Sequence, residues 1–296
     1  MLQTTWGWLI AIYLFLGGLG AGAFLCSALA YKGFLGKLDS KFYNFGFLLA
    51  PVAVIVGTAL LLFDLAPSAA VNPFKILQLY TRPVSMMSIG TYLLTFFIIV
   101  SFVVLLQVRK EVKICDYMLI IGSILAIGVM GYTGLLLYVV KAVPLWASMW
   151  LPILFTVSAI STGFSANAIS SMSGGGLLSH KSHKFHIILV AVEIFALLML
   201  FANARHEAAG MMSITKMVSG SLAVVFWVGF VILGLALPLI SGLKGLIVTP
   251  CVSANTQQTC VLDEAEAKGS TFSEFGVLIG GFCLRVIMVF SAIYIF

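Results

Sequence analysis

Charged side chains are scarce in this chain of 296 residues. Asp, Glu, Lys and Arg together make up 9% of it, whereas apolar residues make up 61%. Uninterrupted apolar runs of about 20 residues recur along the chain, and this is the length that a helix needs to cross a bilayer. The composition therefore excludes a soluble protein, and the runs leave no stretch for a sizeable soluble domain.

Strict alternation of apolar and polar residues, which marks the strands of a membrane barrel, is absent as well. The continuous runs predict an all-α polytopic membrane protein with about eight transmembrane helices. The predicted spans are residues 8–31, 42–63, 86–107, 117–140, 149–172, 184–202, 217–240 and 274–296. We expect a single integral membrane domain over residues 1–296, built as two four-helix bundles at 1–140 and 149–296.

Lysine and arginine are unevenly distributed over the loops. None precedes the first apolar run, which is also too long for a signal peptide, so we expect that helix to remain in the mature protein. Ten of the 16 follow odd-numbered spans and five follow even-numbered spans. Because these residues concentrate on the cytoplasmic side, both termini are predicted to lie outside a cytoplasmic (inner) membrane. The net charge of +6 thus reflects topology and not a nucleic-acid partner.

Histidine and cysteine are too few, and wrongly placed, for common redox centres. A b-type haem needs paired histidines within spans. Three of the four histidines cluster at the start of the sixth predicted span, and we interpret them as interfacial: His180, His183 and His186. The five cysteines show no CxxC spacing, and Cys26 and Cys283 are interpreted as packing residues. We expect no haem, no iron–sulfur cluster and no metal site in this chain.

Two ionisable residues stand in the middle of apolar runs. Glu193 lies in the sixth predicted span and Arg285 in the eighth, at similar depth and with opposite charge. An ionisable group in hydrocarbon is costly unless it is paired or hydrated, which makes each a candidate functional residue. They are either an interhelical clamp or part of a proton relay.

Other polar residues gather near the predicted outer face. Asp64 ends the second span, where a helix C-terminus disfavours a carboxylate. It is either a solvated boundary residue or a site residue neutralised by Arg82 and Lys141. The segment 64–85, with three prolines, is predicted to cap this face.

Aromatic residues lie at the same outer depth. Tyr132 stands near the outer end of the fourth span, with Gly131 and Gly134 beside it. It is either an aromatic-belt residue or a hydroxyl that faces a planar ligand. Tyr13 and Trp6 on the first span lie at similar depth.

Several longer motifs are similar to one known family. WGWLIAIYLFLGGLGAG at 6–22 resembles the first helix of the polysulfide reductase/NrfD family of integral membrane subunits. LFDLAP at 62–67, PVSMMSIG at 83–90 and GYTGLLLYVVKAVPLW followed by LPILFTVSAISTG at 131–163 resemble that family too, as do VEIFALL around Glu193 and FCLRVIMVF around Arg285. Their combined order makes the resemblance specific and extends it over nearly the whole chain.

The resemblance implies a haem-free membrane anchor subunit that exchanges electrons with quinol or quinone near the outer face. Tyr132 aligns with a tyrosine at the quinone headgroup, Asp64 with an acidic residue of the outer site, and Glu193 and Arg285 with positions proposed for proton movement. Tyr13, Trp6, Lys141 and Arg82 complete the expected quinone-binding set. The implied quinone is menaquinone, from the family's common anaerobic setting.

The resemblance also implies partner subunits. These are an iron–sulfur subunit with four clusters and a molybdopterin catalytic subunit or a multihaem cytochrome, which would hold the terminal substrate site. Two alternatives stay open. Glu193 and Arg285 would also suit a proton-coupled secondary transporter or ion channel, although no inverted repeat is visible. A purely structural anchor would leave Asp64 and Tyr132 dispensable.

Overall fold

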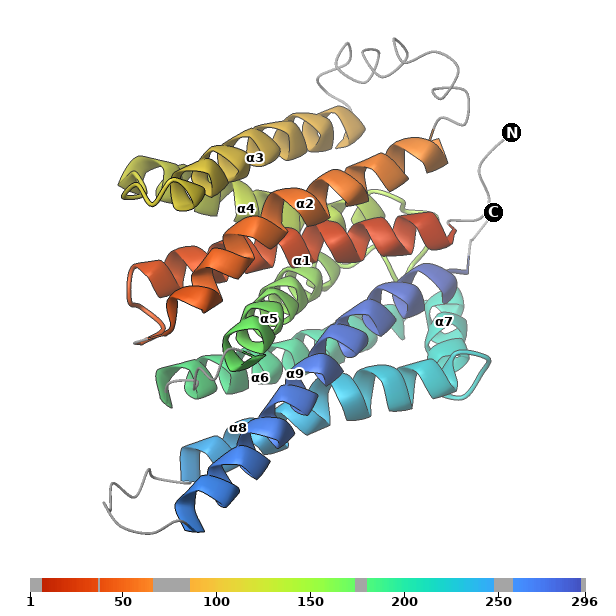
Figure 1. Cartoon of the computed structure of the whole chain (residues 1–296). Helices are drawn as coiled ribbons and strands as arrows, with labels where there is room; N and C mark the ends of the chain where they lie inside the picture. The colour runs from red at the N-terminus through yellow and green to blue at the C-terminus, as the bar shows by residue number, and fades with distance from the viewer. Residues whose placement is uncertain (1–6, 37, 66–85, 174–179, 248–257, 294–296) are drawn as a thin grey trace.

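The computed structural model describes residues 7–36, 38–65, 86–173, 180–247 and 258–293. All regular structure in these ranges is helical (Figure 1). The helices are α1 (Trp8–Tyr31), α2 (Ser40–Leu65), α3 (Met86–Arg109), α4 (Asp116–Tyr138), α5 (Trp150–Ser173), α6 (His180–Ala204), α7 (Ala208–Val218), the π-helix η2 (Val225–Ala236), α8 (Leu237–Ile247) and α9 (Gln258–Phe290). Within the described ranges, eight helices are long and apolar enough to cross a membrane, which confirms the predicted fold class.

The first six predicted spans agree with α1 to α6 within a few residues, but the seventh was wrong in detail. The predicted span 217–240 begins where the short helix α7 ends, and the crossing helix starts later, at Val225. The intervening Ser219, Gly220 and Ser221 are poor helix formers, which explains the break.

The residues between the seventh and eighth predicted spans, for which no helix was predicted, are partly helical. α8 extends to Ile247, and α9 begins at Gln258, well before the predicted eighth span. The segment LDEAEAK at 262–268 is rich in Ala, Glu and Lys, which favour a helix although they disfavour a bilayer. A polar segment was therefore mistaken for a loop.

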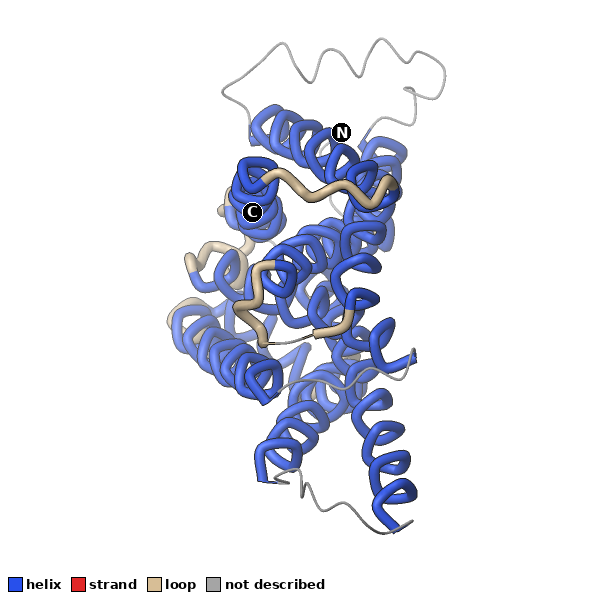
Figure 2. The backbone as a smooth tube through the Cα atoms, turned by 60° about the vertical axis from the view of Figure 1, so that its left-hand side comes forward, coloured by secondary structure: helices blue, strands red, loops and turns tan. Residues whose placement is uncertain are grey.

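Successive spanning helices alternate in direction, so α1, α3 and α5 begin at the end of the bundle where α2, α4 and α9 finish (Figure 1). We call this end the termini end, and the other the opposite end. Seen turned by 60°, the helices form one packed group, and the described loops between them are short (Figure 2).

α1 is the central helix of the packing. It contacts α2, α4, α5 and α9, and 72% of its most apolar window is buried. Glycines bring it directly against α5: a Cβ at Gly22 would lie 2.0 Å from the Ala159 carbonyl oxygen, and one at Gly163 would lie 2.2 Å from the Ala23 nitrogen. The small residues of α1 thus let its backbone pack directly against that of α5.

Candidate functional site

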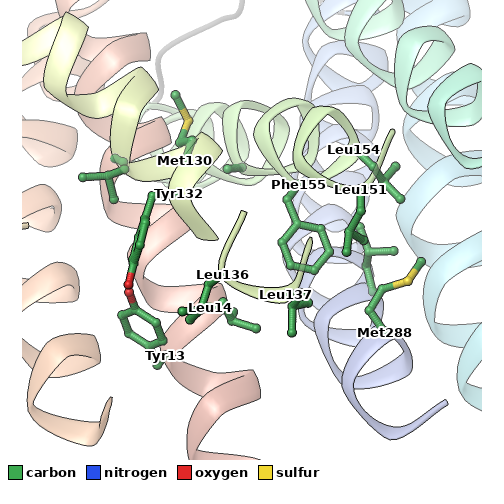
Figure 3. Close-up of a cluster of buried hydrophobic side chains, with 14 of the residues drawn as sticks. Tyr13, Leu14, Met130, Tyr132, Leu136, Leu137, Leu151, Leu154, Phe155 and Met288 are labelled. Carbon is green, nitrogen blue, oxygen red and sulfur yellow. The ribbon is translucent and has the colours of Figure 1, made fainter. Parts of the chain in front are cut away.

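Two buried tyrosines face each other near the termini end. Tyr13 of α1 is 0% exposed and Tyr132 of α4 is 4% exposed. Figure 3 shows their hydroxyl groups pointing toward one another from the two helices. The Tyr13 hydroxyl has no hydrogen-bond partner among the described residues. A buried hydroxyl without a partner is unfavourable, so this position could accept a polar group that the described residues do not supply.

A glycine on a neighbouring helix makes room for the Tyr132 ring. The ring packs against the backbone of Gly90 on α3, because a Cβ there would lie 1.9 Å from Tyr132 Cζ. Gly57 of α2 lies beside Tyr13, but a Cβ at Gly57 would be in ordinary contact, 3.5 Å from Tyr13 Cδ2. Leu14 and Leu136 line the same region with apolar surface (Figure 3). We call Tyr13, Tyr132 and these walls the tyrosine site.

The structure brings Tyr13 and Tyr132 together but separates them from Lys141. Lys141 follows α4 in an exposed loop, and its ammonium nitrogen lies 3.6 Å from the centroid of the Tyr138 ring. Asp64 is the residue before last of α2, so its backbone is at the termini end, but its side chain lies outside the described residues. Trp6 and Arg82 lie outside them altogether.

Arg285 is fully buried and firmly held. Its Nη1 donates to the Ser158 hydroxyl at 2.6 Å and to the Gly281 carbonyl at 2.9 Å, and its Nη2 donates to the Phe155 carbonyl at 3.2 Å. The guanidinium also lies 5.1 Å from the centroid of the Phe155 ring. Three acceptors and an aromatic face offset much of the cost of placing this charge away from water.

Within the described part of the chain, Glu193 and Arg285 form no direct ion pair, because no carboxylate oxygen of Glu193 lies within 4.0 Å of a guanidinium nitrogen of Arg285. Instead, Glu193 interacts with the Ser158 hydroxyl, which also accepts a hydrogen bond from Arg285. The positive charge of Arg285 acts on the Glu193 carboxylate as well. Both side chains thus lie close to Ser158, although Arg285 is five residues before the end of α9 and Glu193 is eleven residues before the end of α6.

A second buried pair was missed from the sequence. His186 Nδ1 of α6 lies 3.4 Å from Glu274 Oε1 of α9, and both side chains are only 5% exposed. Ser161 of α5 lies 3.4 Å from the other ring nitrogen, Nε2. His186 lies only three residues inside the span that begins at His183, but it is buried between helices and paired, which was not predicted from the sequence. His183 is half-buried, and the side chain of His180 lies outside the described residues.

A spacing signal for this pair was present in the sequence. His186 and Glu193 are seven residues apart, about two helical turns, and Glu274 and Arg285 are eleven apart, about three turns. Each helix therefore carries its two ionisable residues on one face. Over the described ranges, no three His, Cys, Asp or Glu side chains gather as a metal site would require.

The sequence comparisons match this arrangement to one group of membrane proteins. A family model described as "Polysulphide reductase, NrfD" matches residues 2–294. The C subunit of polysulfide reductase from Wolinella succinogenes is 32% identical over 264 residues, which covers 79% of this chain and 82% of that protein. Protein NrfD homolog of Haemophilus influenzae is 31% identical over 276 residues, covering 80% and 83%. Protein NrfD of Escherichia coli is 27% identical over 267 residues, covering 79% and 83%.

Proposed function

The chain belongs to the polysulfide reductase NrfD family, and on that premise we propose that it exchanges electrons between membrane quinol or quinone and an iron–sulfur partner subunit. Family membership and the eight apolar helices already make it a multi-pass membrane subunit consistent with a place in a respiratory complex. The proposed exchange takes place at the termini end, on the outer face, with menaquinone as the quinone. A molybdopterin subunit or a multihaem cytochrome would hold the terminal substrate site.

The tyrosine site is the observation that carries this proposal. A quinone headgroup is planar, with an acceptor oxygen at each side of its ring, and its isoprenoid tail is apolar. The unpartnered Tyr13 hydroxyl, the facing Tyr132 hydroxyl and the leucine walls supply the hydrogen-bond donors and the apolar surface that such a group requires. The site also lies near the membrane surface, because Tyr13 is five residues from the start of α1, about 8 Å.

This depth agrees with an anchor that binds no haem. If no haem carries electrons across the bilayer, the quinone must exchange them with an iron–sulfur cluster of the partner subunit just outside the membrane. A tyrosine site at the termini end would be close to such a cluster. Of the histidine side chains that the structure describes, the buried one is His186, and it is engaged by Glu274 and Ser161 instead of facing a second histidine. These observations support electron exchange at the termini end.

The residues of the chain would act by binding, orientation and proton handling. A bound quinone would supply the redox chemistry, which takes up or releases two electrons and two protons. Tyr13 and Tyr132 would donate hydrogen bonds to its oxygens, and the apolar walls would exclude water from them. Asp64, at the same end of the bundle, would accept or return protons. Glu193, Ser158 and Arg285 would hold a proton deeper in the bundle.

The test is quinol oxidation by the complex carrying Tyr132→Phe, which removes the hydroxyl and keeps the ring. With 2,3-dimethyl-1,4-naphthoquinol as donor, we expect turnover to fall by about tenfold or more, since one donor to the headgroup is lost. Tyr13→Phe should do the same. The matched control is Tyr117→Phe, because Tyr117 is 75% exposed at the opposite end. Unchanged quinol kinetics in both buried variants would rule out the tyrosine site.

A further inference from the structure

Buried hydroxyls repeat along one face of α5. Ser158, Ser161 and Ser165 are spaced by three and four residues, which places them on the same side of the helix. All three are buried. Two of them make hydrogen bonds with ionisable side chains: Ser158 with Arg285 at 2.6 Å, and Ser161 with His186 at 3.4 Å. Ser158 also acts electrostatically on Glu193, and Ser165 acts on Glu274, although the Ser165 hydroxyl makes no hydrogen bond among the described residues. In a membrane helix such a face lets neighbouring helices approach closely and offers hydrogen bonds to their polar groups.

The ionisable partners form one continuous set. Glu193 interacts electrostatically with His186 as well as with Arg285, and His183 acts on Glu274. These five groups are the ionisable side chains of α6 and α9 that interact with the buried pair or with its neighbour Glu193. They link Arg285, five residues from the end of α9, to His183, which is half-buried toward the opposite end.

The His186–Glu274 pair is incompletely satisfied. Glu274 Oε2 is buried and makes no hydrogen bond among the described residues. A clamp selected for stability alone would be expected to satisfy both carboxylate oxygens, because an unpaired buried acceptor costs about 1–3 kcal/mol. Imidazole changes its charge near physiological pH, so the pair can hold a proton and release it again.

Arg285, at one end of this set of ionisable residues, contacts α1, the helix that carries Tyr13. A Cβ at Gly18 of α1 would lie 3.4 Å from Arg285 Nη2, so the guanidinium rests against the α1 backbone. The preceding residue, Gly17, contacts the Tyr13 ring, since a Cβ added at Gly17 would lie 3.8 Å from Tyr13 Cε2. One turn of α1 thus separates the arginine from the tyrosine.

We propose that His186 and Glu274 form a proton-exchange site, and that the α5 hydroxyls connect it through Glu193 and Arg285 to the tyrosine site. A proton taken up by the Glu193 carboxylate, such as one released at the tyrosine site by quinol oxidation, passes by way of the α5 hydroxyls to the His186 imidazole. Glu193 then returns to a carboxylate, and His186 becomes an imidazolium whose charge the Glu274 carboxylate stabilises until the proton leaves toward the opposite end. Only O–H and N–H bonds form and break, so no oxidant or reductant is needed. The connection to quinone chemistry rests on the proposed function, whereas the exchange site does not.

The exchange site is tested in the full-length protein in lipid nanodiscs without quinone. Infrared difference spectra between two pH values report carboxyl and imidazole groups that change protonation. We expect His186→Gln and Glu274→Gln each to lose bands that the wild type shows. The matched controls are His206→Gln and Glu207→Gln, at neighbouring exposed positions. Spectra of the buried variants that match those of the controls would overturn the site.

The connection is tested in the complex in proteoliposomes, with a pH dye in the compartment that faces the opposite end. During naphthoquinol oxidation, His186→Gln and Glu274→Gln should slow the proton signal by about tenfold or more. Ser161→Ala, which leaves the pair intact, should slow it as well, so the test does not depend on variants that disturb folding. A proton signal of wild-type rate in Ser161→Ala would overturn the path. If the wild type oxidises no quinol, the proposed function fails, while the infrared spectra still decide the exchange site.

Discussion

The Ser158 hydroxyl lies between two buried ionisable groups, Arg285 and Glu193. Ser158 accepts a hydrogen bond from Arg285 at 2.6 Å and interacts with Glu193, so it stands between a cation and a carboxylate. A direct ion pair would fix both charges on each other. With a hydroxyl between them, Glu193 can change its protonation state while Arg285 keeps the Phe155 and Gly281 carbonyls as acceptors.

The variant Glu193→Gln separates the two roles considered for this residue. The amide keeps the shape and can still hydrogen bond to Ser158, but it cannot carry a proton. We expect quinol turnover or proton coupling to fall by about tenfold or more, while the thermal stability of the complex changes little. Turnover and melting temperature should be measured on the same preparation.

Exposed Glu207→Gln is the control, since it makes the same chemical change outside the membrane-spanning helices. Loss of assembly with normal turnover per assembled complex would identify Glu193 as a structural clamp.

At the scale of elements, α1 and α5 are held together by backbone contact. Gly22 and Gly163 leave no room for a side chain between the two helices. This contact brings the hydroxyl face of α5 within reach of α6 and α9, and it brings α1 within reach of Arg285. The glycines are therefore as important to the site as the ionisable residues are.

Gly163→Ala should destabilise the protein. Its methyl group would fall 2.2 Å from the Ala23 nitrogen and the Gly22 carbonyl carbon, both of which are backbone atoms that cannot rotate away. Overpacking of this kind costs about 1–3 kcal/mol or more, and the melting temperature in detergent should fall accordingly. The control is Gly131→Ala, whose nearest neighbour would be 3.9 Å away. Equal melting temperatures for the two variants would contradict the close contact of α1 with α5.

The elements were predictable from the sequence wherever the signal was local. Apolar runs gave α1 to α6, and positions along the predicted helices gave Tyr13 and Tyr132 a similar depth, but not the contact between their helices. The start of α9 was missed because its polar first turns break the apolar pattern but not the helix. The His186–Glu274 pair was missed because it depends on which helices become neighbours, and no local pattern states that α6 and α9 share α5 as a partner.

At the scale of the whole molecule, the two ends of the bundle differ in character. The termini end holds the tyrosine site. The opposite end carries exposed basic residues and an exposed ion pair in which Lys32 Nζ lies 2.6 Å from Asp116 Oδ1. Lysine and arginine concentrate on cytoplasmic loops, so the opposite end is expected to face the cytoplasm. The tyrosine site would then be close to the outer surface.

Labelling of Cys115 checks this orientation. Cys115 is exposed at the opposite end, whereas Cys26 is buried. In a variant with Cys251→Ser and Cys260→Ser, a membrane-impermeant maleimide should label inverted vesicles and spare right-side-out ones. Adding Cys115→Ser should abolish the signal. Labelling of right-side-out vesicles at Cys115 would reverse the orientation and move the tyrosine site to the cytoplasmic face.

The contact between α1 and α5 also has a consequence for biosynthesis. Gly22 leaves the ribosome roughly 140 residues before Gly163, which at 5–20 residues per second is roughly 7 to 30 s of translation. During that interval the glycine face of the first helix stands in the membrane without the helix that covers it. We therefore expect the insertion machinery either to cover the glycine face of α1 or to delay the release of α1 into the lipid until α5 has been made. The order in which the helices insert would then affect whether the protein reaches this fold.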